Sequence, residues 1–141
     1  MRQPLFCIAA ATAATALAGA ASAQTLPQRD DPAWEAIGTT ADGTRYDILP
    51  ARTSREHTTV WLVLRATVAP SPTGSPNTVV AYAVVDCAAS AIGVGTTEFY
   101  NVTQEFLRTV EGPEDPVPGP ATDPGQLMLI RHVCSDQSAG T

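Results

Sequence analysis

Two runs that both end in cysteine decide the fold: Thr78-Val-Val-Ala-Tyr-Ala-Val-Val-Asp-Cys87 and Asp123-Pro-Gly-Gln-Leu-Met-Leu-Ile-Arg-His-Val-Cys134. The first is apolar at odd and even positions alike, which is typical of a central strand covered on both faces. The second begins like a helix, because Asp123 can serve as an N-cap and Pro124 suits the first turn. We therefore expect a strand and a terminal helix whose ends are joined by a disulfide.

The predicted helix is amphipathic. At about 100° per residue its apolar side chains share one broad face, which contains Leu127, Leu129, Ile130, Val133 and Cys134. Arg131 and His132 are expected on the opposite side. The helix should therefore lie on a sheet by its apolar face.

Further strands follow from short alternating runs bounded by turn residues. In chain order we expect strands at Trp34–Thr39, Thr44–Leu49, Thr58–Val68, Thr78–Cys87, Ala91–Asn101 and Val102–Val110. The predicted fold class is α+β: an antiparallel β-sheet of about five or six strands, with one C-terminal helix packed on it and a single disulfide. It occupies residues 34–135 as a single domain, preceded by a flexible lead-in at 24–33 and followed by a polar tail at 136–141.

The clearest strand, Thr58–Val68, has two different faces. One is wholly apolar and belongs to the core; its residues are Val60, Leu62, Leu64, Ala66 and Val68. The other carries Trp61, which is either buried under the helix or exposed for a partner, and we favour burial. It also carries Arg65, which we expect to pair with Asp86 on the neighbouring strand.

Glycines and prolines mark irregular backbone in the second half of the chain. Gly93 and Gly95 suggest a bulge or a place where another backbone comes close. Residues 112–123 contain four prolines, and we expect this segment to cross the sheet rather than to act as a proline-rich ligand. Asn101-Val102-Thr103 matches a glycosylation sequon, a pattern that is frequent by chance.

Residues 1–23 have the three parts of a secretory signal peptide: Arg2, an apolar Ala-rich stretch, and the cleavage motif Ala21-Ser22-Ala23. We predict cleavage near Ala23 and a protein that is exported, either periplasmic or secreted. Cys7 would leave with the signal. No later apolar run is long enough to span a membrane.

Cleavage leaves Cys87 and Cys134 as an even pair in an oxidising compartment. Their bridge closes a loop of about 48 residues, worth about 4 kcal/mol by the chain-entropy argument. The alternative is a redox or metal pair, but the chain has no C-x-x-C motif and its histidines lack ligand spacing. We favour a structural disulfide and predict neither a metal nor a cofactor.

The net charge of the chain limits the classes of partner that it can bind. Removal of 23 of the 141 residues leaves 118, in which seven arginines face fourteen acidic residues, a net charge of −7, and lysine is absent. Binding to nucleic acid or to anionic membranes requires clustered cations. This composition therefore points away from both.

Few residues suggest a site. Arg52, Arg55 and His57 lie in a polar connection that is either a small cationic binding site or, as we favour, a solvated turn. No Ser lies in a Gly-x-Ser-x-Gly turn, and an enzyme would need His57 or His132 in a cleft beside a nucleophile. We therefore expect a non-enzymatic protein, with Trp61, Arg52 and Arg55 as the candidate partner-binding residues.

The order of features resembles the surface-adhesin E-like family of small exported bacterial proteins. The matching segments span residues 34–134 and are Thr59-Val60-Trp61-Leu62-Val63, Val85-Asp86-Cys87, Thr97-Glu98-Phe99-Tyr100-Asn101 and Pro124-Gly125 leading to Val133-Cys134. The resemblance implies an antiparallel sheet with a C-terminal helix, the Cys87–Cys134 disulfide, a homodimer as one assembly, and adhesion to host matrix proteins. Two features depart from the family: the chain lacks a lipoprotein signal, and it is acidic and free of lysine.

Two functions follow from these observations. The first is an exported, non-enzymatic binding module that resembles surface adhesin E, with a host matrix or cell-envelope protein as partner. The second is an inhibitor or accessory protein of a cell-envelope enzyme. The sequence does not choose the partner.

Overall fold

The computed structural model describes residues 33–135 of the chain. The predicted signal peptide, nearly all of the lead-in and the tail lie outside the described residues. The elements are β1 (Glu35–Thr39), β2 (Arg45–Ile48), the 3-10 turn η1 (Pro50–Arg52), β3 (Ser54–Glu56), β4 (Thr59–Thr67), β5 (Pro76–Asp86), β6 (Ala91–Asn101), β7 (Phe106–Val110), β8 (Gly119–Pro120) and α1 (Pro124–Ser135).

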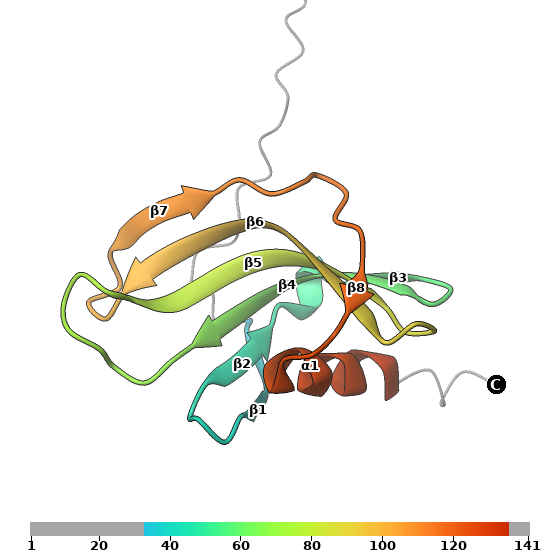
Figure 1. The fold of residues 1–141 in the computed structure, drawn as a ribbon, viewed down its shortest axis with the longest axis horizontal. Coiled ribbons are helices and arrows are strands. Elements are labelled where there is room, and N and C mark those ends of the chain that lie inside the picture. Colours follow the sequence, from blue (N-terminus) through green and yellow to red (C-terminus); the bar gives the residue numbers. More distant parts are fainter. Residues whose placement is uncertain (1–32, 136–141) are drawn as a thin grey trace, which may run out of the picture.

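Six strands form one curled antiparallel sheet in the order β1-β2-β4-β5-β6-β7, so each long strand pairs with its neighbour in sequence (Figure 1). The two short strands extend it: β3 pairs with the start of β4, and β8 with the start of β6. The helix α1 lies on one face of the sheet. The predicted fold class is confirmed.

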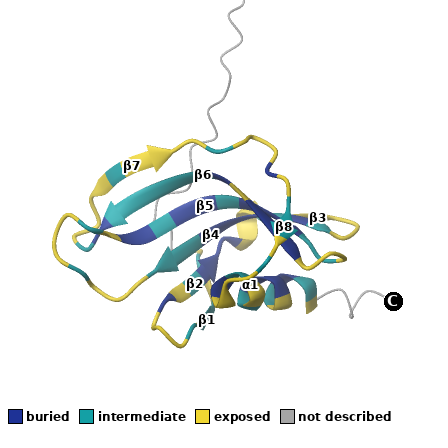
Figure 2. Cartoon of the chain, viewed as in Figure 1, coloured by how far each residue is buried: buried dark blue, intermediate teal, exposed yellow. Residues whose placement is uncertain are grey.

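The main core lies between α1 and this face. Val60, Leu62 and Leu64 of β4 are buried there, as the alternation predicted, and Leu129, Ile130 and Val133 of α1 pack against them. Leu127 is exposed, because it lies at the edge of the helical stripe, so its predicted place in the core is wrong. Figure 2 shows the buried positions of α1 turned toward the sheet.

The start of α1 is fixed by a cap and by a close contact. The Asp123 carboxylate accepts hydrogen bonds from the backbone N–H groups of Gly125 and Gln126, at 2.8 and 3.2 Å, which confirms the predicted N-cap. Gly125 is buried against the ring of Tyr46 on β2, and a Cβ at position 125 would overlap that ring. Only glycine therefore allows the helix to approach β2 this closely.

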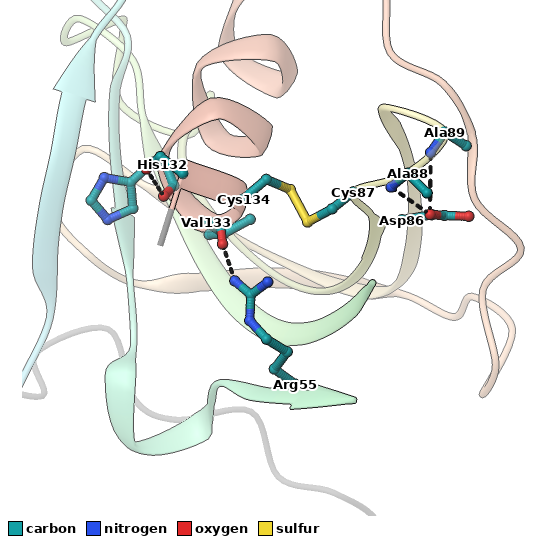
Figure 3. Close-up of a disulfide and its surroundings, with 9 residues drawn as sticks. Arg55, Asp86, Cys87, Ala88, Ala89, His132, Val133 and Cys134 are labelled. Atoms are coloured by element: carbon teal, nitrogen blue, oxygen red, sulfur yellow. Dashed lines mark hydrogen bonds between the residues drawn. A yellow bond between two sulfur atoms is a disulfide. The ribbon is translucent and has the colours of Figure 1, made fainter. Parts of the chain in front are cut away.

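The end of α1 is fixed covalently. Cys134 forms the predicted disulfide with Cys87, with the two Cα atoms 5.6 Å apart, at the point where the chain leaves β5 (Figure 3). The Arg55 guanidinium from β3 also donates a hydrogen bond to the Val133 carbonyl. This helix end is thus held to two separate strands.

The glycines of β6 accommodate a bulge and a second backbone, as expected. The register between β5 and β6 shifts opposite Tyr82, between Ala81 and Ala83. A Cβ on Gly93 would lie 2.9 Å from the backbone of Val117, so residues 112–118 can cross β6 only because side chains are absent there. The proline-rich segment therefore packs on the sheet, with Pro116 buried.

The predicted start of the last long strand is wrong. The last long strand begins at Phe106 rather than Val102, because a turn intervenes in which the Asn101 side chain accepts from the Glu105 N–H at 2.9 Å and donates to its carboxylate at 3.0 Å. Asn101 is 3% exposed, so the sequon serves this turn.

The predicted Arg65–Asp86 pair does not form. The register places Thr59 opposite Asp86 and Val80 opposite Arg65. Asp86 instead accepts hydrogen bonds from the backbone N–H groups of Ala88 and Ala89 in the turn that follows (Figure 3).

The Gly125 contact gives a test of the fold. Gly125→Ala should lower the free energy of unfolding by about 1–3 kcal/mol, because the added methyl group forces α1 away from Tyr46. Urea unfolding of the oxidised protein measures the change. Gly119→Ala is the matched control, since a Cβ there has no neighbour within 4 Å; equal losses in both variants would contradict the close-contact explanation.

Candidate binding face

Within residues 33–135, no α-helix covers the side of the sheet opposite α1, and we call this side the helix-free face. Alternation along β4 and β5 fixes its members, because residues that point away from the α1 core point to this side. They are Thr59, Trp61, Val63, Arg65 and Thr67 on β4, paired with Asp86, Val84, Tyr82, Val80 and Thr78 on β5. Trp61 is half-buried here, so the prediction that α1 covers it is wrong.

Aromatic side chains gather on the helix-free face. A small second core of Leu49, Val63 and Val80 is buried there, and Trp34, Tyr82 and Tyr100 pack against it while remaining partly exposed. With Trp61, four half-buried aromatic residues therefore share this side of the sheet. Trp, Tyr and Arg are the residue types that most often dominate the binding energy of protein interfaces.

Charged groups lie beside these aromatics. Asp47 of β2 is 1% exposed, and its carboxylate accepts hydrogen bonds from Arg65 Nε at 3.0 Å and Arg45 Nε at 2.9 Å. The guanidinium of Arg65 also lies 4.7 Å from the centre of the Trp34 ring, within the range of a cation–π contact. The ion pair and the ring together orient Arg65 on the face.

Three aromatic side chains of this face carry polar groups in different states. Burial, aided by the charge of Asp115, raises the pKa of Tyr82, so its hydroxyl remains protonated at neutral pH. The Tyr100 hydroxyl donates to Glu98 at 2.6 Å. Within residues 33–135, the buried indole N–H of Trp34 has no acceptor, and an unsatisfied buried donor is costly.

The structure does not bring the three candidate partner-binding residues together. Trp61 lies on the helix-free face, whereas the Arg55 side chain reaches the helix side and contacts Val133 (Figure 3). Arg52 is exposed on η1. Trp61 therefore belongs to a different surface from Arg55.

Arg55 lies at a small cleft of about 300 Å³ between β3 and the end of α1. Its polar lining residues are Glu35, Thr53, Ser54, Arg55 and His132. His132 Nε2 is 3.7 Å from Glu35 Oε1, and no hydrogen bond joins it to Thr53 or Ser54 in the described part of the chain. His57 is exposed in the β3–β4 turn, with a left-handed φ of 52°. No group of three or more His, Cys, Asp or Glu residues that could hold a metal occurs within residues 33–135.

The fold and the helix-free face define a small antiparallel-sheet protein with one disulfide-anchored helix. One solved structure with a similar fold is crystal form II of Haemophilus influenzae protein E, which matches 80% of this chain and 95% of that chain with a TM-score of 0.51 and 14% identity. The selenomethionine form of the same protein matches 79% of this chain and 92% of that chain, with a TM-score of 0.48 and 14% identity. The predicted resemblance to the surface-adhesin E-like family is confirmed at the level of the fold.

Comparison of the sequence with known proteins found no relative. No family model matches the chain, and no curated protein matches it. Among residues 33–135, no helix has the length and apolar character needed to cross a membrane.

Sequence reasoning found Trp61 but missed the aromatic residues around it. Tyr82 could have been placed by alternation, because it stands opposite Val63 once β4 and β5 are paired. Trp34 could not, because its position depends on the irregular register between Ala36 and Gly38 of β1. Arg65 was assigned to Asp86, since nothing in the sequence indicates that Asp47 is buried.

The buried carboxylate gives a test of how this face is organised. Asp47→Asn should lower the free energy of unfolding by about 1–3 kcal/mol, because two guanidinium groups lose their counter-charge. Partial solvent access to Arg45 and Arg65 favours the lower end of this range. Denaturant unfolding measures the loss, and the exposed Glu56→Gln is the control, expected to change it by less than about 0.5 kcal/mol. If Asp47→Asn left the free energy of unfolding unchanged, the ion pairs of Asp47 with Arg45 and Arg65 would not organise this face.

Proposed function

We propose that this protein is an exported, non-enzymatic binding module that recognises a protein partner through its helix-free face. The observation that carries the proposal is that half-buried aromatic side chains lie on the side of the sheet that no helix of residues 33–135 covers: Trp34, Tyr82 and Tyr100 around the second core, with Arg65 over Trp34, and Trp61 further along β4. Large rigid aromatic rings give contact area at a low cost in conformational entropy. Two small clefts lie away from this face, one between β3 and the end of α1 and one between the β1–β2 turn and the start of α1. A broad aromatic face suits a protein surface.

Export is part of the proposal. The Cys87–Cys134 disulfide suits an oxidising compartment, where such bonds persist. The predicted signal peptide at residues 1–23, with cleavage near Ala23, would deliver the chain there. The folded unit then acts in the periplasm or outside the cell.

Charge supports a protein partner. The chain has a net charge of −6 and no lysine, and nucleic acid would repel such a surface. The likeness to protein E concerns the fold, and we extend it to adhesion only as the first partner class to test. A host matrix protein and an enzyme of the cell envelope are the two classes that the experiment separates.

The test is capture with the oxidised mature protein as bait, offered a panel of purified matrix proteins and an envelope extract side by side. Trp61→Ala should weaken capture of the identified partner at least about tenfold, as expected for an aromatic hot spot. Leu127→Ala is the matched control, because Leu127 is exposed on α1, on the other side of the molecule. Thermal unfolding checks that both variants are folded.

Each result has a definite meaning. A matrix protein retained at physiological salt and lost with Trp61→Ala supports adhesion. An envelope enzyme retained in the same way supports the inhibitor or accessory function. A partner that binds Trp61→Ala as well as the parent protein would show that the helix-free face is the wrong surface.

A further inference from the structure

The strand β7 forms an open edge of the sheet. Among the described strands it pairs only with β6, so one side of its backbone has no strand beside it. The strand at the other end of the sheet, β1, is placed differently: α1 lies against it, with Met128 near Gly38 and His132 near Glu35. Figure 1 shows β7 at the side of the sheet far from α1. The two edges are therefore not equivalent.

The open edge carries exposed apolar side chains. Phe106 is 56% exposed and Val110 is 48% exposed, and Figure 2 shows most of β7 in the exposed colour. Proteins usually protect such an edge with lysine, proline or a covering segment. Here the one cation, Arg108, folds back over the Phe99 ring at 4.5 Å from its centre. A bulge at Leu107 interrupts the ladder with β6 without covering the outer side.

Acidic residues stand at both ends of this edge. Glu105 precedes β7 and Glu111 follows it, and Glu114 and Asp115 continue the acidic run. Hydrogen bonds from Asn101 and Thr103 lower the pKa of Glu105, so this carboxylate is ionised at neutral pH. A strand added to β7 would therefore meet negative charge at each end and an arginine near the middle.

This charge pattern disfavours a second copy of the chain as the added strand. Antiparallel pairing of two β7 strands over their full length is centred on Arg108 and sets Glu105 of one copy opposite Glu111 of the other. Like charges directly opposite each other destabilise a strand pair. All three charged positions would be mismatched in this full-length register, whereas a basic segment of a different chain would match both glutamates.

We propose that β7 is a docking edge for an extended segment of a partner protein that carries a basic residue at each end of a short apolar stretch. The segment adds to the sheet as an antiparallel strand next to Phe106–Val110. Main-chain hydrogen bonds supply affinity in this mode of recognition, and alternate side chains supply specificity. The site adjoins the helix-free face at one point, where the Phe106 ring lies edge-on to Tyr100 with ring centroids 5.9 Å apart.

The probe is a β-hairpin peptide closed by an Asn-Gly turn, whose outer strand reads Lys-Val-Thr-Glu-Thr-Val-Lys. Its order sets lysine opposite Glu105 and Glu111 and glutamate opposite Arg108. The peptide is titrated to millimolar concentration into the ¹⁵N-labelled oxidised protein. We expect shifts in the amides of residues 105–111 and slower hydrogen exchange there, with affinity that falls as salt rises.

Two controls make the result specific. A hairpin with the charges exchanged, Glu-Val-Thr-Arg-Thr-Val-Glu, should bind about tenfold more weakly or worse, because all three cross-strand pairs become repulsive. Val110→Lys should weaken binding of the first hairpin by a similar factor. Val117→Lys makes the same change at a residue that is 87% exposed and off this edge, and it should leave binding unchanged.

Other outcomes overturn the proposal. They are an absence of shifts at β7, equal binding of the two hairpins, and full binding by Val110→Lys. Shifts confined to Trp61, Tyr82 and their neighbours would also overturn it while favouring the helix-free face. The docking edge and the proposed function can therefore fail independently.

Discussion

The attachment of α1 at both of its ends is the constraint on which the rest of the structure depends. A helix of twelve residues has little stability of its own in water, so packing and anchoring must hold it. Gly125 allows close contact with Tyr46 at one end, and the disulfide holds Cys134 to the end of β5 at the other. Because β2 and β5 lie on either side of β4, these two anchors hold α1 across the curled sheet.

This attachment decides which side of the sheet remains open. One helix covers the buried residues Val60, Leu62 and Leu64. No helix of the described residues covers the smaller core of Leu49, Val63 and Val80 on the other side. Aromatic side chains shield it instead, and the proline-rich segment crosses beside it. The aromatics therefore have a structural role whether or not a partner binds. Their partial exposure is what turns that role into a candidate binding surface, since a ring that is half covered by the protein can bury its other side in a partner.

The sequence predicts the elements of this protein better than it predicts their contacts. Turn residues, alternation and the helix cap place most of the strands, the helix and the disulfide. Those signals act over a few residues, whereas the partner of Arg65 depends on which residue of β2 stands beside it. A one-residue difference in register moves a side chain to the other face. The same limit explains why the cover over Trp61 was predicted wrongly: a strand with two usable faces does not indicate which one the helix will take.

The absence of lysine has a different meaning at the two edges of the sheet. At β1 the helix lies against the strand, and no charge is required to keep other strands away. At β7 exposed apolar side chains would be expected to promote association between copies. Three charged residues oppose this association: Glu105, Arg108 and Glu111. When two β7 strands pair antiparallel over their full length, each of them lies opposite a residue of the same charge in the other copy. Lysine in place of both glutamates would repel other copies equally well but would also repel a basic partner. The two glutamates oppose full-length pairing of two copies while they leave the edge attractive to basic segments, so the same charges favour a basic partner segment over that pairing.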